Sequence, residues 1–380
     1  MYDLSRIVVQ SHFRASTEKK RTTNLLAAKR GESSYLPASF AIGWIETYLK
    51  YAFKKKHPFV EYAPGEIGVY ALPVQAKIAL AGDWGTGTNE AALVGQRMQE
   101  FGPDYAIHLG DVYFVGDADE VKQNFLGVPG NSSFDPVKWP TAHIRSFSLS
   151  GNHDMYSSGD GYFDVLLPGL DQKASFFCIE NEFWKIIGLD TGYNSTGMFA
   201  KHNLPDALMK WLLTTAFSTF AGSNQGIILL SHHQPWSSFE RAIYPRAAQQ
   251  LACFIKKPVL WFWGHEHRMV AYELFYPKSG IAAYGRCIGH GGMPVERKGP
   301  INKDVPWLIY DNRRYPNAAG LDVGYNGHAE LEFSGQNLNV NYRDLTGGLA
   351  YREAWGVDAG GNLVRHDLSM GDNYPQVLHS

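Results

Sequence analysis

The sequence predicts an α/β fold made of layered sheets and helices. Short apolar runs typical of buried strands alternate with segments of helical periodicity. The 380 residues are 44% hydrophobic, which is enough for a large core, and only 19% charged, which argues against global disorder. Strands that alternate with helices favour sheets whose faces are covered by helices.

The predicted elements follow one another from residue 75 onward. Helices are predicted over residues 88–101, with Thr88 as the N-terminal cap, and over residues 245–255. Asn181 and the S-G-Q-N segment at 334–337 predict two hairpins. The predicted strands are the runs at 77–81, 105–109, 144–149, 174–180, 183–190, 226–230, 258–263, 328–333 and 338–342.

The chain is predicted to have an N-terminal extension over 1–72, a main domain over 73–345 and a C-terminal tail over 346–380 with a candidate hairpin. Residues 1–60 contain eleven Lys or Arg against four Asp or Glu. Apolar residues at helical spacing predict a helix that begins near Ser39. The preferred interpretation is a helix packed on the main domain with a solvated basic end. The alternative is contact with an anionic membrane or with nucleic acid.

Bulk charge and cysteine content narrow the class of protein. A net charge of −2 argues against nucleic-acid binding driven by overall charge. Cys178, Cys253 and Cys287 are too widely spaced for a disulfide framework or a thiolate zinc site. The N-terminal residues lack the pattern of a signal peptide or of a spanning helix, so a cytoplasmic location is expected. The sequence does not predict an oligomeric state.

Polar side chains follow five of the predicted strands. In open α/β sheets, ligands bind beyond the carboxyl ends of strands. Two carboxylates gathered there would repel each other and would be costly to bury without a cation. A set of oxygen and nitrogen donors without sulfur suits Fe, Mn or Zn. The residues that follow the strands are Asp83, Asp111, Asn152, His153, Asp154, His232, His233, His265 and His267.

The motif order G-D, G-D, G-N-H-D, His and G-H-E-H resembles the calcineurin-like metallophosphoesterase superfamily. The G-D-W-G segment is most similar to purple acid phosphatase-like members. The resemblance covers residues 76–267 by motif and extends to about residue 345 with the later hairpin. It implies a four-layer α/β/β/α sandwich of two mixed sheets, with a two-metal centre between them.

The resemblance also implies a role for each residue. Asp111 would bridge the two ions, and Asp83 and His267 would hold the first of them. The second ion would be held by Asn152, His232 and His265. His153 would lie beside the substrate phosphoryl group, where it would stabilise charge and donate a proton to the leaving oxygen.

The first metal position departs from the pattern of the superfamily. Gly85 stands where the general G-D-x-H pattern has a histidine, and Phe114 stands where purple acid phosphatases have a tyrosine ligand. Tyr113 is adjacent, but in an extended segment its side chain would face the other way. Water is the preferred replacement ligand, with Tyr113 on an irregular loop or His290 as alternatives. Tyrosine–iron ligation and the purple colour that it brings are therefore predicted to be absent.

Two assignments keep an alternative. In S-H-H-Q, His232 is preferred as the ligand because it comes first after the strand, whereas alignment on the following proline favours His233. Asp154 would either orient the imidazole of His153 or form a turn.

The resemblance implies a metal-dependent phosphohydrolase. It would cleave a phosphomonoester or phosphodiester, including nucleotides, by attack of a metal-bridging hydroxide at a dinuclear centre. No G-x-S-x-G elbow or P-loop in the sequence suggests another mechanism. The alternative is a non-catalytic binding or scaffold protein that retains the fold, and the missing first-metal ligand supports that alternative.

Overall fold

The computed structural model describes residue 51 and residues 54–130, 135–196, 200–218, 224–316 and 322–371. The helix predicted to begin near Ser39 and most of the predicted extension over 1–72 lie outside the described residues. Among the helices of the described ranges, none combines the length and the hydropathy needed to cross a membrane.

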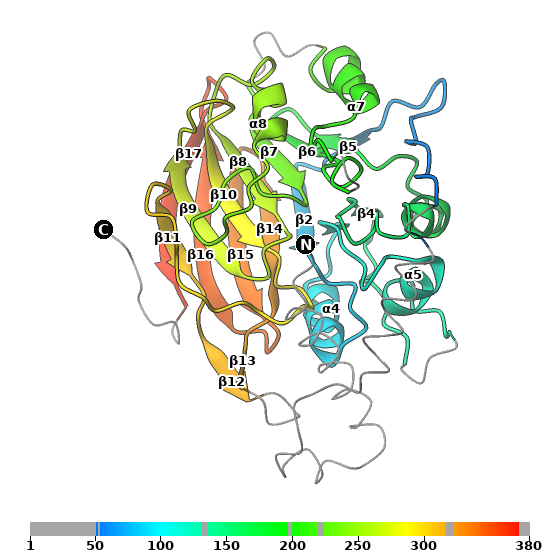
Figure 1. Ribbon diagram of the computed structural model, residues 1–380. Coiled ribbons are helices and arrows are strands. Elements are labelled where there is room, and N and C mark those ends of the chain that lie inside the picture. The colour runs from blue at the N-terminus through cyan, green and yellow to red at the C-terminus, as the bar shows by residue number, and fades with distance from the viewer. Residues whose placement is uncertain are drawn as a thin grey trace.

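The described strands form two large mixed sheets and one small sheet (Figure 1). The eight-stranded sheet contains, in spatial order, β1 (Val69–Ala71), β5 (Phe177–Glu180), β6 (Trp184–Gly188), β7 (Gly226–Ser231), β8 (Val259–Trp263), β10 (Ala283–Ile288), β9 (Met269–Phe275) and β11 (Trp307–Tyr310). The seven-stranded sheet contains β17 (Leu363–Met370), β16 (Leu349–Val357), β15 (Asn337–Asp344), β14 (Gly327–Ser334), β2 (Gln75–Ala81), β3 (Tyr105–His108) and β4 (Arg145–Ser148). The small sheet pairs β12 (Arg314–Pro316) with β13 (Asp322–Gly324).

Three apolar clusters arrange these elements in four layers. The largest cluster lies between the two sheets, where residues such as Ile107 and Phe262 are fully buried. A second cluster packs α7 (Asp206–Trp211), η2 (Leu212–Ala216) and α8 (Arg246–Leu251) on the outer face of the eight-stranded sheet. A third packs α4 (Asn89–Phe101), α5 (Ala118–Asn124), η1 (Gly161–Leu166) and α6 (Leu167–Gly169) on the seven-stranded sheet. The predicted α/β/β/α sandwich is confirmed, and Figure 1 shows α4 and α5 at the lower right and α7 and α8 at the top.

Several local predictions are confirmed. Thr88 caps α4, because its side chain accepts a hydrogen bond of 3.1 Å from the amide of Ala91. Asn181 joins β5 and β6 as the turn of a hairpin, and its side chain accepts bonds of 2.8 Å from the amides of Phe183 and Trp184. The hairpin of β14 and β15 also forms, with Gly335 at φ 60° in its turn.

The seven-stranded sheet continues past residue 345. β16 pairs with β15 and β17 pairs with β16, in both cases antiparallel. Within the residues predicted to be a tail over 346–380, those described up to 371 therefore contribute two strands to the sheet. At the other end of the chain, β1 pairs with β5 from inside the predicted extension.

The topology brings the carboxyl ends of six strands to one edge between the sheets. β2, β3 and β4 are parallel to one another, and β6, β7 and β8 are parallel in the other sheet. The sheets come very close there: a side chain at Gly82 would place its Cβ 2.9 Å from the Cα of Gly264. Only glycine fits this contact, so the two glycines allow the G-D motif after β2 and the G-H motif after β8 to lie next to each other.

Candidate metal centre

The side chains predicted to bind the first metal converge in the structure. The hydroxyl of Tyr113 donates a hydrogen bond of 2.6 Å to Asp83 Oδ1 and lies 3.1 Å from Asp111 Oδ2. The same hydroxyl lies 3.1 Å from His267 Nε2, which is itself 3.4 Å from Asp83 Oδ1. Asp83, Asp111 and His267 are all buried. Two carboxylates, an imidazole and a phenol therefore share one small volume.

The side chains predicted for the second metal converge around His232. Its Nε2 atom lies 3.2 Å from Asp111 Oδ2, from Asn152 Oδ1 and from His265 Nδ1. Its Nδ1 atom lies 2.9 Å from the carbonyl of Leu109, an acceptor that fixes the ring and directs Nε2 into the cluster. Asp111 belongs to both groups, which is the geometry expected of a bridging ligand.

Three of the proposed metal ligands have a strained backbone conformation that directs their side chains into the cluster. Asp83, Asp111 and His265 have φ values of 57°, 73° and 66°, in the left-handed region that side chains other than glycine rarely adopt. Such conformations cost about 1–3 kcal/mol each and are concentrated at functional sites. Here each one turns the chain sharply at the carboxyl end of a strand.

The prediction that Tyr113 faces away from the first metal position is wrong. That prediction assumed an extended segment after β3, in which alternate side chains point to opposite faces. The left-handed conformation of Asp111 breaks this alternation two residues earlier. As a result the Tyr113 hydroxyl, and not the ring of Phe114, reaches Asp83 and Asp111.

His290 lies elsewhere. Its imidazole is buried, and the charged groups that act on it are those of Asp311, His328 and Arg313. Burial lowers the pKa of His290 to about 4. The alternative in which His290 completes the first site therefore has no support in the structure.

His232 and His233 have different surroundings. His232 contacts three of the predicted ligands, whereas His233 packs against Thr191, Tyr244 and His202. His233 still has a ring nitrogen within 4.8 Å of donor atoms on both His232 and His265. The geometry favours His232 as the ligand, with His233 behind it.

His153 is the predicted catalytic residue, and it lies at the rim of the cluster. Its Nδ1 atom lies 2.6 Å from the carbonyl of Phe114, and its Nε2 atom lies 4.0 Å from Asp111 Oδ2. Its side chain is 20% exposed, and the Phe114 carbonyl anchors the ring through Nδ1. Asp154 does not touch this imidazole: it accepts hydrogen bonds from the amides of Asp111, Val112 and Gly151. The turn-forming alternative for Asp154 is therefore the correct one.

The electrostatics of the cluster call for a cation. In the described part of the chain, neither Asp83 nor Asp111 forms an ion pair with lysine or arginine. Burial alone would raise the pKa of Asp111, but His232 and His153 hold it well below its ordinary value. Against the lowering effect of burial, Asp111 raises the pKa of His232 to about 9. A bound cation would compensate the two carboxylates, and oxygen and nitrogen donors fit Fe, Mn or Zn.

Sequence reasoning missed several supporting groups. The hydroxyl of Tyr244 lies 3.3 Å from His265 Nε2, and Asn152 Nδ2 donates a bond of 2.7 Å to the hydroxyl of Tyr156. Thr191 Oγ1 accepts bonds from the amides of His232 and His233. These groups orient the proposed metal ligands. They lie in loops without a recognisable motif, so in the sequence only their aromatic or hydroxyl character could have pointed to the site.

Two facing mixed sheets with carboxylate and imidazole groups at their common edge define the class of a metallophosphoesterase. Residues 76–269, half of the chain, match the family model described as calcineurin-like phosphoesterase. The chain therefore belongs to the calcineurin-like phosphoesterase family. A comparison with curated protein sequences gave no match.

Solved structures share the fold at low sequence identity. Purple acid phosphatase PPD1 from yellow lupin seeds is 15% identical, with a TM-score of 0.50 over 73% of this chain and 53% of that one. The match thus spans about half the length of the lupin protein. GAP50 of Plasmodium is 15% identical, with a TM-score of 0.49 over 75% of this chain and 89% of that one. PhoD is 12% identical, with a TM-score of 0.48 over 83% and 74%. At these identities the likeness concerns the fold alone.

Proposed function

We propose that this protein is a dinuclear metal-dependent phosphohydrolase that cleaves phosphomonoesters or phosphodiesters. The observation that carries the proposal is the pair of overlapping donor groups that share Asp111. The first group adds Asp83, Tyr113 and His267, and the second adds Asn152, His232 and His265. Donor atoms of Asp83, Asp111 and His232 all lie within 4.8 Å of one another, close enough to surround small cations.

The chemistry divides between the ions and the chain. Bound divalent or trivalent ions of this kind lower the pKa of water and neutralise charge on phosphoryl oxygens. The chain holds the donors in place through Leu109, Tyr244 and Thr191, so little reorganisation is needed during the reaction. Because Nδ1 is bonded to the Phe114 carbonyl, only the imidazolium form of His153 has a proton on Nε2 for the leaving oxygen. Burial lowers the pKa of this imidazole, and the neighbouring Asp111 opposes that shift.

The alternative of a non-catalytic scaffold rested on the missing first-metal ligand. The Tyr113 hydroxyl lies 2.6 Å from Asp83 Oδ1, within reach of the proposed first metal, and this supports the enzyme over the scaffold. The proposed substrates are small phosphate esters or nucleotides. A cytoplasmic location, and contact of basic residues 1–60 with membrane or nucleic acid, stay predictions from the sequence.

The test is hydrolysis of an aryl phosphate by protein loaded with Mn, Fe or Zn. We expect turnover in the wild-type protein, and we expect His153→Asn to lower kcat by about 10²–10⁴-fold, the usual contribution of a general acid. The metal content of His153→Asn should equal that of the wild type, because His153 is not one of the proposed ligands. A purified protein that stays metal-free and inert with all three metals would favour the scaffold.

Tyr113 gives a spectroscopic prediction that replaces the expectation, drawn from the sequence, that tyrosine–iron ligation is absent, because its hydroxyl reaches Asp83 and Asp111. If its phenolate completes the first site, protein loaded with ferric iron should absorb visible light through phenolate-to-metal charge transfer. Tyr113→Phe should lose this band. Tyr156→Phe should keep it, since Tyr156 contacts Asn152 and not the first donor group. A ferric protein without the band, or a band that survives in Tyr113→Phe, would rule out this ligand.

A further inference from the structure

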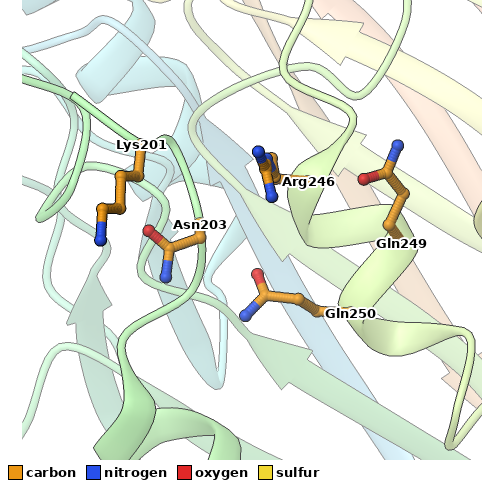
Figure 2. A pocket seen from close by; sticks show the side chains of 5 residues that line it. All are labelled: Lys201, Asn203, Arg246, Gln249 and Gln250. Atoms are coloured by element: carbon orange, nitrogen blue, oxygen red, sulfur yellow. The ribbon is translucent and has the colours of Figure 1, made fainter. Parts of the chain in front are cut away.

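A pocket lined by polar side chains lies between the segment of Lys201 and Asn203 and the helix α8. It has a volume of about 590 Å³. Figure 2 shows Lys201 and Asn203 on one wall, with Arg246, Gln249 and Gln250 from the α8 segment on the other. A loop and the helix α8 (Arg246–Leu251) therefore build a pocket with two cations and three amides, and no carboxylate is among the residues that line it.

Aromatic contacts connect this pocket to the metal centre. His202 stands between Lys201 and Asn203, and its ring centroid is 4.7 Å from that of Tyr244. The hydroxyl of Tyr244 in turn lies 3.3 Å from His265 Nε2. Arg246 follows Tyr244 by two residues. Both cations are therefore anchored next to rings that reach a proposed ligand of the second metal.

The side-chain amides of Asn203 and Gln250 are hydrogen-bonded to the backbone, whereas the two cations of the pocket have no carboxylate partner within the described ranges. The amide of Leu204 donates a bond of 2.8 Å to Gln250 Oε1, and Asn203 Nδ2 donates one of 3.0 Å to the carbonyl of Leu204. Within the described ranges, neither Lys201 nor Arg246 forms an ion pair with a carboxylate, and both are exposed. Hydrogen bonds from these side-chain amides fix the loop against α8, so Lys201 and Arg246 lie on one concave surface.

A neighbouring pocket of about 460 Å³ shares Lys201 and Asn203 with the first pocket. Lys56 lines it, with its ammonium 3.6 Å from the ring centroid of Tyr193. Asp206 is the one carboxylate among the residues that line this second pocket. Three cations, Lys56, Lys201 and Arg246, therefore line two adjoining pockets that contain a single acid.

We propose that the pocket of Lys201 and Arg246 binds a second phosphate group of the substrate, beyond the one that is hydrolysed. This inference rests on the proposed function and makes it more specific. Lysine and arginine are the side chains that recognise phosphate, arginine often through two parallel hydrogen bonds. The substrate class is then a compound with more than one phosphate, such as a nucleoside polyphosphate or an inorganic polyphosphate.

The test compares tripolyphosphate with an aryl monophosphate on the full-length, metal-loaded protein. For the double variant Lys201→Gln/Arg246→Gln, we expect calorimetric binding of tripolyphosphate to weaken at least tenfold at low salt. The KM for tripolyphosphate should rise by a similar factor, and by clearly more than the KM for the aryl phosphate. The effect should shrink at high ionic strength, as screening of exposed charges requires.

Two controls separate charge from folding. Lys210→Gln removes an exposed lysine of α7 outside the pocket. This variant should change neither the binding of tripolyphosphate nor the KM for the aryl phosphate. Lys201→Arg/Arg246→Lys keeps both charges and should retain most of the binding. Unchanged tripolyphosphate binding in the double Gln variant, or equal losses for both ligands, would overturn the inference. Calorimetry decides this even in a protein without turnover, so failure of the proposed function would be seen separately.

If an adenine-containing triphosphate behaves like tripolyphosphate in wild type and variant, the phosphates alone are recognised. A larger loss for the nucleotide would mean that the pocket also positions the nucleoside. Either result supports a second phosphate site, because both depend on the same two cations.

Discussion

Replacement of Asp111 by asparagine is expected to remove most metal and to lower kcat/KM for an aryl phosphate by more than about 100-fold. Even loss of an outer-shell partner costs about 10–100-fold in metal affinity or activity, and Asp111 touches both donor groups. Asparagine keeps the shape and an oxygen that accepts the bond of 2.8 Å from the His153 amide. The change therefore removes charge and little else.

Elemental analysis and steady-state kinetics check this prediction together. The wild-type protein should retain two ions per chain, and Asp111→Asn fewer than one. Asp119→Asn is a suitable control, because that carboxylate is 84% exposed on α5 and should alter neither quantity. Full activity in metal-bound Asp111→Asn would remove the bridging role from the proposal.

The second large effect concerns stability. Arg286 on β10 and Glu353 on β16 form a two-pronged ion pair of 2.8 and 2.6 Å, and both side chains are fully buried between the sheets. Arg286→Met would leave the Glu353 carboxylate buried with only the 2.8 Å bond from the Tyr342 hydroxyl. Breaking a buried pair in this way costs about 3–5 kcal/mol.

Chemical denaturation measures the free energy of unfolding for this test. The double variant Arg286→Met/Glu353→Met should recover most of the loss, since replacing a whole buried pair by apolar residues is often neutral. If the double variant were no more stable than Arg286→Met, the loss would come from packing and not from an unpaired charge.

The same ion pair explains why the sequence hid part of the seven-stranded sheet. β16 reads L-A-Y-R-E-A-W-G-V, with two adjacent charges in its middle, which is unlike a buried strand. Glu353 is tolerated there because Arg286, 67 residues earlier, neutralises it from the other sheet. A local pattern cannot contain such a partner, so residues 346–380 were predicted to be a tail with a candidate hairpin, and not two further strands of the sheet.

The metal centre was predictable because its residues follow strands in fixed motifs. Parallel strands end at one edge, so Asp83, Asp111, Asn152 and the histidines had to meet there. Tyr113 was misplaced because its direction depends on the φ angle of Asp111, a property of the folded backbone at one residue. The pocket of Lys201 and Arg246 was invisible for a similar reason: it needs a loop and α8 brought together by tertiary structure.

Anomalous scattering from a crystal grown with manganese tests the central claim most directly. Data collected at the manganese absorption edge should give two peaks roughly 3.5–4 Å apart. One should lie among Asp83, Tyr113 and His267, the other among Asn152, His232 and His265, with Asp111 touching both. A single peak, no peak at saturating manganese, or peaks remote from Asp111 would contradict the account.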